Sequence, residues 1–291
     1  MPRSYDGIPG SAGLPRNVRP MSAARALSMT DINPIGHTGS VSQDQFVRVA
    51  PLYDQLMHDV PYGRWIEYLR ELLATRGASP RSVLDLACGT GNVSELLCAE
   101  GYAVAGVDIA EHMIAEARRK AGERGLPVQY AVQDAALLDL PGQRFDLCVS
   151  LFDSLNYVTD LDRLRQAMER VQAHLTRNGL FIFDMNSDYA LRNRFFDQNN
   201  RATDAGLRYD WISEYDADTR LCRIKMHFWN REEDGSETTF YEEHRQFAYR
   251  HDEVVEMLES AGYEDVAAFQ AYTLRTPTRT SDRIFYIARR P

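Results

Sequence analysis

Hydrophobic and polar residues follow two different rhythms along the chain. Up to about residue 186, short apolar runs alternate with stretches in which apolar residues recur every three to four positions. The short runs are typical of buried strands, and the longer spacing is typical of amphipathic helices. We therefore expect strands at Arg81–Leu86, Tyr102–Val107, Pro127–Val132, Phe145–Leu151 and Gly179–Asp184, with helices between them at Asn92–Gly101, Glu111–Arg124 and Asp160–Leu175.

Between about residues 187 and 250 the period changes to two. In Leu221–Trp229, for example, apolar positions alternate with polar ones. Alternation of this kind, joined by short polar turns, predicts an antiparallel sheet. Its expected strands are Leu207–Tyr215, Leu221–Trp229 and Thr239–Tyr249, and a helix at Asp252–Ala261 and strands near Val266–Tyr272 and Arg283–Ala288 follow.

Strands that alternate with helices predict an α/β fold, with a mostly parallel sheet covered on both faces. Two helices are expected before the first strand, one from Asp44 with Phe46 and Tyr53 on its apolar face, and one after Pro61. Residues 1–40 are rich in Gly, Pro, Ser and Arg and are interpreted as a disordered leader. The remaining divisions are 41–186 for the N-terminal helices and cofactor-binding core, 187–250 for an antiparallel insert or lid, and 251–291 for a helix and strands that complete the core.

Composition excludes several classes of function. With 33 Lys and Arg against 42 Asp and Glu, the 291-residue chain has a formal net charge of −9. This balance argues against binding to nucleic acid or anionic membranes by bulk electrostatics. No apolar run is long enough to span a bilayer. The four cysteines are scattered, without a CxxC pair, so we expect no disulfide scaffold and no metal site, and a cytoplasmic protein.

The sharpest chemical signal is a glycine turn between the first core strand and the next helix. Asp85 precedes Gly89 and Gly91, and Ala87 lies between Asp85 and Gly89. Glycines allow a tight turn and a close approach of the backbone to a ligand, and the helix adds free N–H groups. Because Ser94 stands where a dinucleotide fingerprint has its third glycine, and because Asp85 would repel a pyrophosphate, a ligand with an ammonium group fits better.

Two further acids follow the next two strands. Asp108, with Ile109 beside it, is placed to accept both hydroxyls of a ribose. Asp134, between Gln133 and Ala135, is placed to accept from an adenine amino group. Since ligands of open α/β sheets bind at the carboxyl ends of the strands, the three acids match the amine, ribose and adenine of one molecule.

With these motifs the sequence resembles class I S-adenosylmethionine-dependent methyltransferases. The motifs in order are Val83–Gly91, Gly106–Asp108, Gln133–Ala135, Phe145–Tyr157 and Gly179–Asp184. The resemblance implies a Rossmann-like, seven-stranded doubly wound sheet, mostly parallel with an antiparallel terminal hairpin, and S-adenosyl-L-methionine as cofactor. More loosely, the chain is similar to uncharacterised bacterial small-molecule methyltransferases and to amino-sugar N,N-dimethyltransferases. That likeness implies that Tyr53 reaches the cofactor's methionine end, with Trp65 as a weaker contact and Leu151 beside the cofactor.

The acceptor side has five candidates. An amine nucleophile must lose a proton, and His244 or Asp153 could take it. Asn156 and Tyr157 could orient the acceptor without taking its proton, and Tyr53 would face it. Three of them have an alternative interpretation: Tyr53 as helix packing, Asp153 as a helix cap, and His244 as part of a solvated charged strand.

We therefore predict transfer of a methyl group to the nitrogen or oxygen of a small molecule by in-line displacement. The expected partner is that acceptor, without nucleic acid or membrane, and a homodimer is considered. The alternatives are an RNA or protein methyltransferase, or a non-catalytic S-adenosylmethionine-binding regulatory protein.

Overall fold

The computed structural model describes residues 45–201, 206–232 and 234–291, so the predicted leader at residues 1–40 lies outside the described residues. Seven strands form the core sheet in the order β10-β11-β5-β4-β1-β2-β3. The strands β1 to β5 pair in parallel, and β11 runs antiparallel to both β5 and β10. The predicted doubly wound sheet is therefore confirmed. Its strands are β1 Ser82–Leu86, β2 Ala103–Asp108, β3 Gln129–Val132, β4 Phe145–Ser150, β5 Leu175–Asn186, β10 Glu264–Gln270 and β11 Arg283–Arg289.

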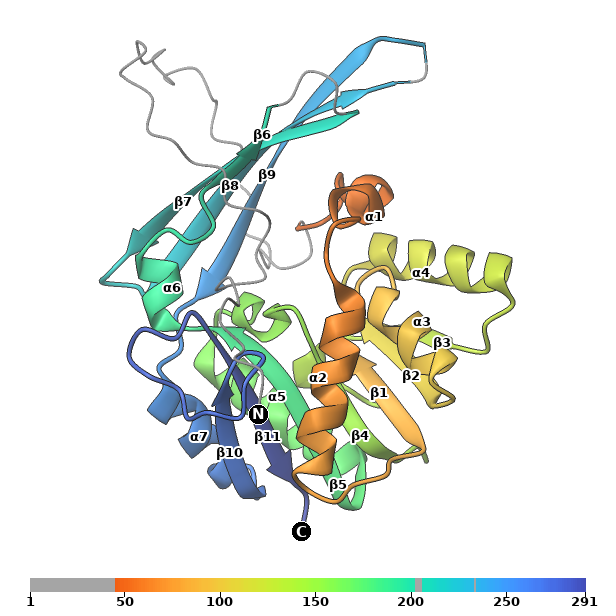
Figure 1. Cartoon of the computed structure of the whole chain (residues 1–291), viewed down its shortest axis with the longest axis vertical. Coiled ribbons are helices and arrows are strands. Elements are labelled where there is room, and N and C mark those ends of the chain that lie inside the picture. The colour runs from red at the N-terminus through yellow and green to blue at the C-terminus, as the bar shows by residue number, and fades with distance from the viewer. Residues whose placement is uncertain (1–44, 202–205, 233) are drawn as a thin grey trace, which may run out of the picture.

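Helices cover both faces of this sheet (Figure 1). They bury apolar side chains against it. On one face α2 and α3 contribute residues such as Trp65 and Leu97, and on the other α5 and α7 contribute residues such as Leu164 and Leu258. Removal of this apolar surface from water is the main stabilising contribution of such a core. The helices are α2 Tyr62–Ala74, α3 Asn92–Ala99, α4 Glu111–Arg124, α5 Leu161–His174 and α7 His251–Ser260.

A second, antiparallel sheet extends from the core in Figure 1. Its strands pair in the order β6-β7-β8-β9, with bounds Gln198–Asn200, Leu207–Asp216, Leu221–Arg231 and Glu237–Phe247. The period-two pattern places Ile224, Met226 and Phe228 on the buried face of β8. This face packs against Val49 and Leu56 near the start of the described chain. The predicted antiparallel insert is present as its own sheet.

The N-terminal segment differs from its prediction. Instead of one long helix, a single 3-10 turn at Ala50–Leu52 leads into a short helix α1, Tyr53–Leu56, and Phe46 has a left-handed φ of 67°. Pro51 supplies no N–H and sits at the start of the 3-10 turn, so a continuous helix cannot run through it. The short strand β6 and the helix α6, Asp188–Arg192, were also not predicted.

Within the residues that the structure describes, no helix is long and apolar enough to cross a membrane. Cys88, Cys98, Cys148 and Cys222 are all free thiols.

Candidate functional site

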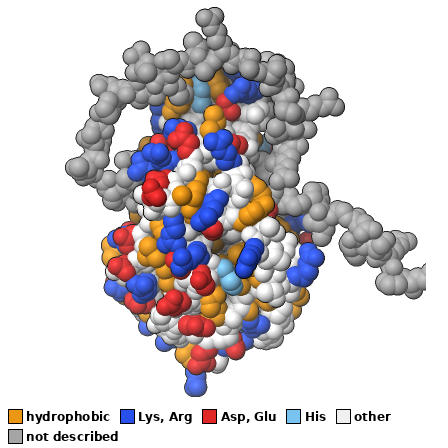
Figure 2. Space-filling view, turned by 90° about the vertical axis from the view of Figure 1, so that its left-hand side faces the viewer, with side chains coloured by type: hydrophobic (Ala, Val, Ile, Leu, Met, Phe, Trp, Pro, Cys, Tyr) orange, Lys and Arg blue, Asp and Glu red, His pale blue; other side chains and the backbone are white. Residues whose placement is uncertain are grey.

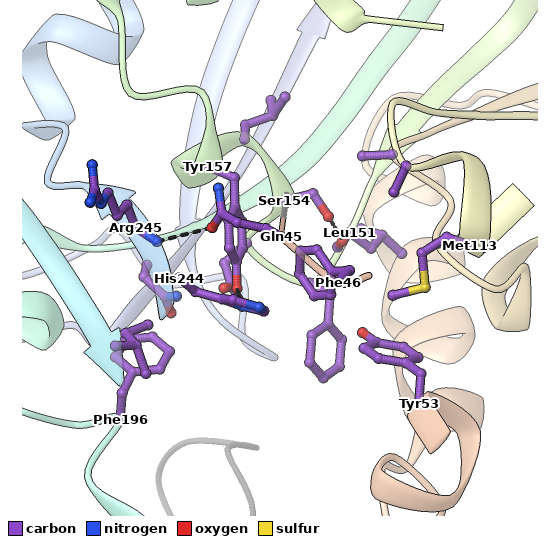
Figure 3. Close-up of a pocket in the computed structure, with 18 of the residues that line it drawn as sticks. Gln45, Phe46, Tyr53, Met113, Leu151, Ser154, Tyr157, Phe196, His244 and Arg245 are labelled. Carbon is purple, nitrogen blue, oxygen red and sulfur yellow. Dashed lines mark hydrogen bonds between the residues drawn. The ribbon is translucent and has the colours of Figure 1, made fainter. Parts of the chain in front are cut away.

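A cavity of about 880 Å³ lies between the two sheets. One part is lined by the residues that follow β1, β2 and β3, among them the three predicted acids, and the other by β7, β8 and β9 of the second sheet. Ligand sites in proteins typically enclose about 300–1,000 Å³, so this cavity lies at the large end of that range. Figure 3 shows Tyr53 and Met113 on one side and Tyr157, His244 and Arg245 on the other, with Phe46 between them.

The glycine turn after β1 is tightly wound. Ala87 and Gly89 have left-handed φ values of 58° and 55°, and both line the cavity. No atom lies within 4 Å of the place where a Cβ of Gly89 would stand. Gly91, with φ 83°, does not line the cavity: a side chain there would overlap the hydroxyl of Tyr130. Gly91 therefore serves the packing of the turn against β3, while Gly89 leaves open space beside the backbone.

Asp108, at the end of β2, lines the cavity and holds the turn. Its two carboxylate oxygens accept the N–H groups of Gly89 and Ala110, each at 2.8 Å. Burial raises the pKa of this carboxyl, although the backbone hydrogen bonds oppose that effect. A carboxylate oxygen has more than one lone pair, so Asp108 can accept from a ligand as well. Ile109 lines the cavity beside it.

Asp85 lies deepest of the three acids. Its side chain is buried and accepts a hydrogen bond of 2.6 Å from the hydroxyl of Ser94. Among the described residues, no Lys, Arg or His forms an ion pair with it. Burial, assisted by the charge of Asp108, raises the pKa of Asp85 to about 7. A buried carboxylate without a cation suits a ligand that brings its own positive charge.

Gln133, Asp134 and Ala135 line the cavity after β3. Asp134 caps the next 3-10 turn by accepting the N–H of Ala136 at 2.9 Å, and its other oxygen pairs with Arg163. The side chain of Gln133 turns toward the backbone of Asp139. Leu151, after β4, completes this side of the cavity.

Tyr53 lines the cavity from α1, and its neighbour Asp54 fixes that helix to the glycine turn. Asp54 accepts from the hydroxyl of Thr90 at 2.6 Å and the amide of Asn92 at 3.0 Å, and it pairs with the buried Lys120. These contacts hold Tyr53 over the turn. Lys120 was not predicted, because a single lysine on a helix surface gives no signal of burial.

Asp153 is part of a buried ionic cluster with Asp184 and Arg283. Arg283 donates to Asp153 at 2.7 Å and also pairs with Asp184, and Asp184 accepts the N–H groups of Phe152 and Asp153. Phe152 and Asp153 have left-handed φ values of 72° and 52°, and these bonds hold that strained pair in place. Burial raises the pKa of Asp184 to about 6, and Arg283 opposes it. Since the other oxygen of Asp153 accepts from Gln246 at 2.6 Å, this carboxylate is engaged on both sides.

Besides Gly91, two predicted residues are not part of the cavity lining. Trp65 is buried under it, with its ring stacked on Phe152 at 5.0 Å between centroids, so it supports a lining residue. Asn156 is fully buried, and its amide group bonds to the backbone of Asn186 and Phe247. Its hydrogen bonds join the core to the second sheet, which leaves it in a structural position.

His244 lines the cavity from β9 and is only 2% exposed. Its ring nitrogens contact the hydroxyl of Tyr157 at 3.3 Å and the carboxylate of Glu242 at 2.8 Å. The alternative interpretation of a solvated charged strand is wrong, because even positions of β9 face inward. No role was predicted for Glu242, because its position among charged residues concealed the burial of its side chain.

Among the described residues, no group of three or more His, Cys, Asp or Glu side chains could hold a metal ion.

Comparisons with known proteins agree with this geometry. Residues 83–179 match the family model described as a methyltransferase domain. A protein of Geobacillus sp. (strain WCH70) that carries a methyltransferase name is 32% identical over 241 residues, which are 82% of this chain and 96% of the relative.

Solved structures are similar over the same span. An S-adenosylmethionine-dependent methyltransferase from Clostridium acetobutylicum ATCC 824 is 30% identical, with a TM-score of 0.73 over 83% of this chain and 97% of that one. An amino pentose methyltransferase from Micromonospora echinaspora, solved with S-adenosylmethionine bound, shares the fold with a TM-score of 0.66 at 20% identity, over 82% of this chain and 97% of that one.

Proposed function

This chain belongs to the class I S-adenosylmethionine-dependent methyltransferases, and from that membership we propose that it methylates the nitrogen or oxygen of a small molecule held in the cavity. The observation that carries the proposal is the continuity of the cavity. It joins the strand ends that bear Asp85, Asp108 and Asp134 to the apolar face of the second sheet. Two reactants bound there would be held side by side and away from water.

The residues at the strand ends fit the cofactor. We propose that Asp85 receives its ammonium, Asp108 its ribose hydroxyls and Asp134 its adenine amino group. Gly89, Ala87, Ile109, Gln133, Ala135 and Leu151 would surround it, and Tyr53 would contact its methionine end. When bound, the cofactor supplies a methyl group already activated by a sulfonium. The protein then has to align the nucleophile, exclude water and accept a proton.

The charges around the cavity support a small acceptor over nucleic acid. Each lining arginine lies beside a carboxylate: Arg163 with Asp134, Arg194 with Asp197, Arg245 with Glu243, and Arg283 with Asp153 and Asp184. Figure 2 shows acidic and basic side chains interspersed on the face that it views. Binding of a phosphate backbone depends on uncompensated Lys and Arg, which this lining does not offer. The name of the Micromonospora enzyme, an amino pentose methyltransferase, also supports a small acceptor.

Release of S-adenosylhomocysteine across a panel of amines, sugars, phenols, RNA and peptides tests the proposal. We expect turnover with at least one small molecule and none with RNA or peptide. Turnover confined to RNA or peptide would support the first alternative. Tight cofactor binding without any turnover would support a regulatory protein and contradict the proposal.

We predict that the affinity for S-adenosylhomocysteine rises by roughly fivefold to tenfold between about pH 6 and about pH 7.5. A carboxyl with a raised pKa binds a proton in the free protein, and an ammonium ligand must displace it. Asp85, with a pKa of about 7, changes from mostly protonated to mostly ionised over this range, so binding strengthens as the pH rises. Calorimetric titration at the two pH values measures the effect.

Two controls show whether Asp85 causes this pH dependence of binding. Adenosine has no ammonium group, so its affinity should stay the same at both pH values. The variant Asp85→Asn should bind S-adenosylhomocysteine weakly and without the rise. A pH dependence that persists in this variant would exclude Asp85 as the ammonium site.

We also propose that the protein works in the cytoplasm. Its four free thiols are typical of a reducing compartment.

A further inference from the structure

Three polar side chains form a line at the wall of the cavity. The hydroxyl of Tyr157, in the 3-10 turn Ser154–Tyr157, is 3.3 Å from Nδ1 of His244, and Nε2 of His244 is 2.8 Å from Oε2 of Glu242. Tyr157 and His244 line the cavity, and Glu242 lies behind them. Figure 3 shows the Tyr157 and His244 side chains meeting beside Phe46.

Glu242 is held as an ionised carboxylate. Its oxygens accept the backbone N–H groups of Phe46, Arg48 and Val49 at 2.8–3.2 Å, in addition to the contact with His244. Burial favours the neutral form, but these hydrogen bonds and His244 outweigh it and lower the pKa of Glu242. An ionised Glu242 can only accept, so it selects the His244 tautomer with hydrogen on Nε2. Nδ1 is then free to accept the hydroxyl hydrogen of Tyr157.

Tyr157 remains a neutral phenol. Burial, assisted by the charge of Asp153, raises the pKa of its hydroxyl well above the usual value. A neutral phenol is a poor base by itself. Its oxygen can take a proton only if its own proton leaves at the same time, and His244 is placed to receive it.

Many of the side chains around this line are apolar. The cavity wall near the second sheet and the N-terminal segment includes the hydrophobic side chains of Phe46, Val49, Leu56, Met57, Phe195, Phe196, Trp211, Ile224, Met226 and Phe228, beside polar ones such as Gln45, Gln198 and Asn199. Trp211 is only 9% exposed, and its indole N–H has no hydrogen-bond partner among the described residues. A buried N–H without a partner favours a ligand with a neutral oxygen nearby.

Two of the four carboxylates in the acceptor part of the cavity are already paired with arginines. Asp153 and Asp197 lie beside Arg283 and Arg194, whereas Asp160 and Asp282 accept backbone N–H groups. An ammonium beside Asp153 or Asp197 would lose its water without gaining an uncompensated negative charge. A sugar would bury several hydroxyls against the hydrophobic side chains of the wall. A neutral hydroxyl compound with an apolar ring avoids both costs.

We propose that the acceptor is an uncharged, ring-bearing hydroxyl compound such as a phenol, and that its proton passes to His244 through the oxygen of Tyr157. This inference rests on the proposed function. As the acceptor oxygen forms a bond to the methyl carbon, the carbon–sulfur bond breaks and its electron pair stays on sulfur. The acceptor proton moves to the Tyr157 oxygen, the Tyr157 proton moves to Nδ1 of His244, and Glu242 stabilises the resulting imidazolium. Tyr157 is the catalytic residue of this relay, and Glu242 is a positioning residue.

A binding experiment tests the relay without turnover. Para-nitrophenol changes its visible absorption when it ionises, so titration into the protein saturated with S-adenosylhomocysteine reports the ionised fraction of the bound phenol. At a pH near its solution pKa, we expect a several-fold higher ratio of ionised to neutral nitrophenol in the wild type than in Tyr157→Phe. The variant Tyr62→Phe is the matched control, because Tyr62 lines the same cavity outside the relay, and it should keep the wild-type ratio. Equal ratios in all three proteins would overturn the relay.

Methyl transfer to phenols of graded acidity supplies the second test. Tyr157→Phe should lower kcat for para-cresol by roughly 10²- to 10³-fold, because an un-ionised acceptor needs the relay. For para-nitrophenol, which ionises by itself at neutral pH, we expect a loss of less than about tenfold. Tyr53→Phe should lower both rates by one common factor. A Tyr157→Phe loss that is the same for both acceptors would indicate a structural role and contradict the relay.

Glucosamine distinguishes the inference from the proposed function. Turnover with phenols and none with glucosamine supports both the proposed function and the phenolic acceptor. Turnover with glucosamine and none with phenols leaves the proposed function in place and overturns the acceptor class. Cofactor binding without turnover on any compound overturns both.

Discussion

Replacing Asp108 with alanine should weaken binding of S-adenosylhomocysteine by about 100-fold to 10,000-fold. The proposed site gives Asp108 two hydrogen bonds from ribose hydroxyls, and each hydrogen bond to a charged group contributes about 1.5–3 kcal/mol. The carboxylate already lies in the cavity, fixed by the N–H groups of Gly89 and Ala110 at 2.8 Å, so no rearrangement is needed to receive the ligand. Isothermal titration calorimetry measures the loss.

Asp139 provides the matched control for this experiment. It is an exposed acid in the loop after β3 and does not line the cavity. Asp139→Ala should bind S-adenosylhomocysteine within about twofold of the wild type. Because Asp108 also holds two backbone N–H groups, its removal should cost about 1–3 kcal/mol of stability, and thermal unfolding checks that the variant is folded. A folded Asp108→Ala protein with unchanged affinity would exclude the ribose assignment.

The variant Arg283→Met should lower the free energy of unfolding by about 3–5 kcal/mol. Arg283 pairs with Asp153 and Asp184, which are 5% and 0% exposed, and its guanidinium lies over the ring of Trp65 at 5.4 Å. Removing one partner of a buried ion pair leaves its charge without compensation, and here two carboxylates would be left. Chemical denaturation measures the change.

Two further variants show whether buried charge causes the loss of stability in Arg283→Met. Arg289 lies on the same strand and pairs with the exposed Asp265, so Arg289→Met should cost less than about 1 kcal/mol. Adding Asp153→Asn and Asp184→Asn to Arg283→Met should recover part of the lost stability, because the unpaired charges are gone. If Arg283→Met and Arg289→Met cost the same, the cluster contributes no more than a surface ion pair.

The sequence predicted the parts of the fold that depend on local pattern. Apolar runs and helical spacing located the core strands within a few residues, and period-two alternation identified β7, β8 and β9. The same pattern predicted the position of the three acids, because an acid at the carboxyl end of a buried parallel strand must lie at the ligand-binding edge of the sheet. The structure does place Asp85, Asp108 and Asp134 around one cavity.

The sequence could not reveal contacts between segments far apart in the chain. Glu242 is separated by 193–196 residues from the backbone groups that it binds, and Asp153 by 130 residues from Arg283. Nothing near Asn156 in the sequence indicates that its amide is used by the backbone of Asn186 and Phe247. Burial of these polar groups follows from how the second sheet meets the core, and short-range periodicity contains no information on that arrangement.

A crystal structure with S-adenosylhomocysteine would show whether the three acids at the strand ends bind one cofactor molecule. We expect one molecule across the ends of β1, β2 and β3, with its ammonium at Asp85, its ribose hydroxyls at Asp108 and its adenine amino group at Asp134. A nucleoside bound elsewhere, or in this place without contact to these three carboxylates, would contradict the account.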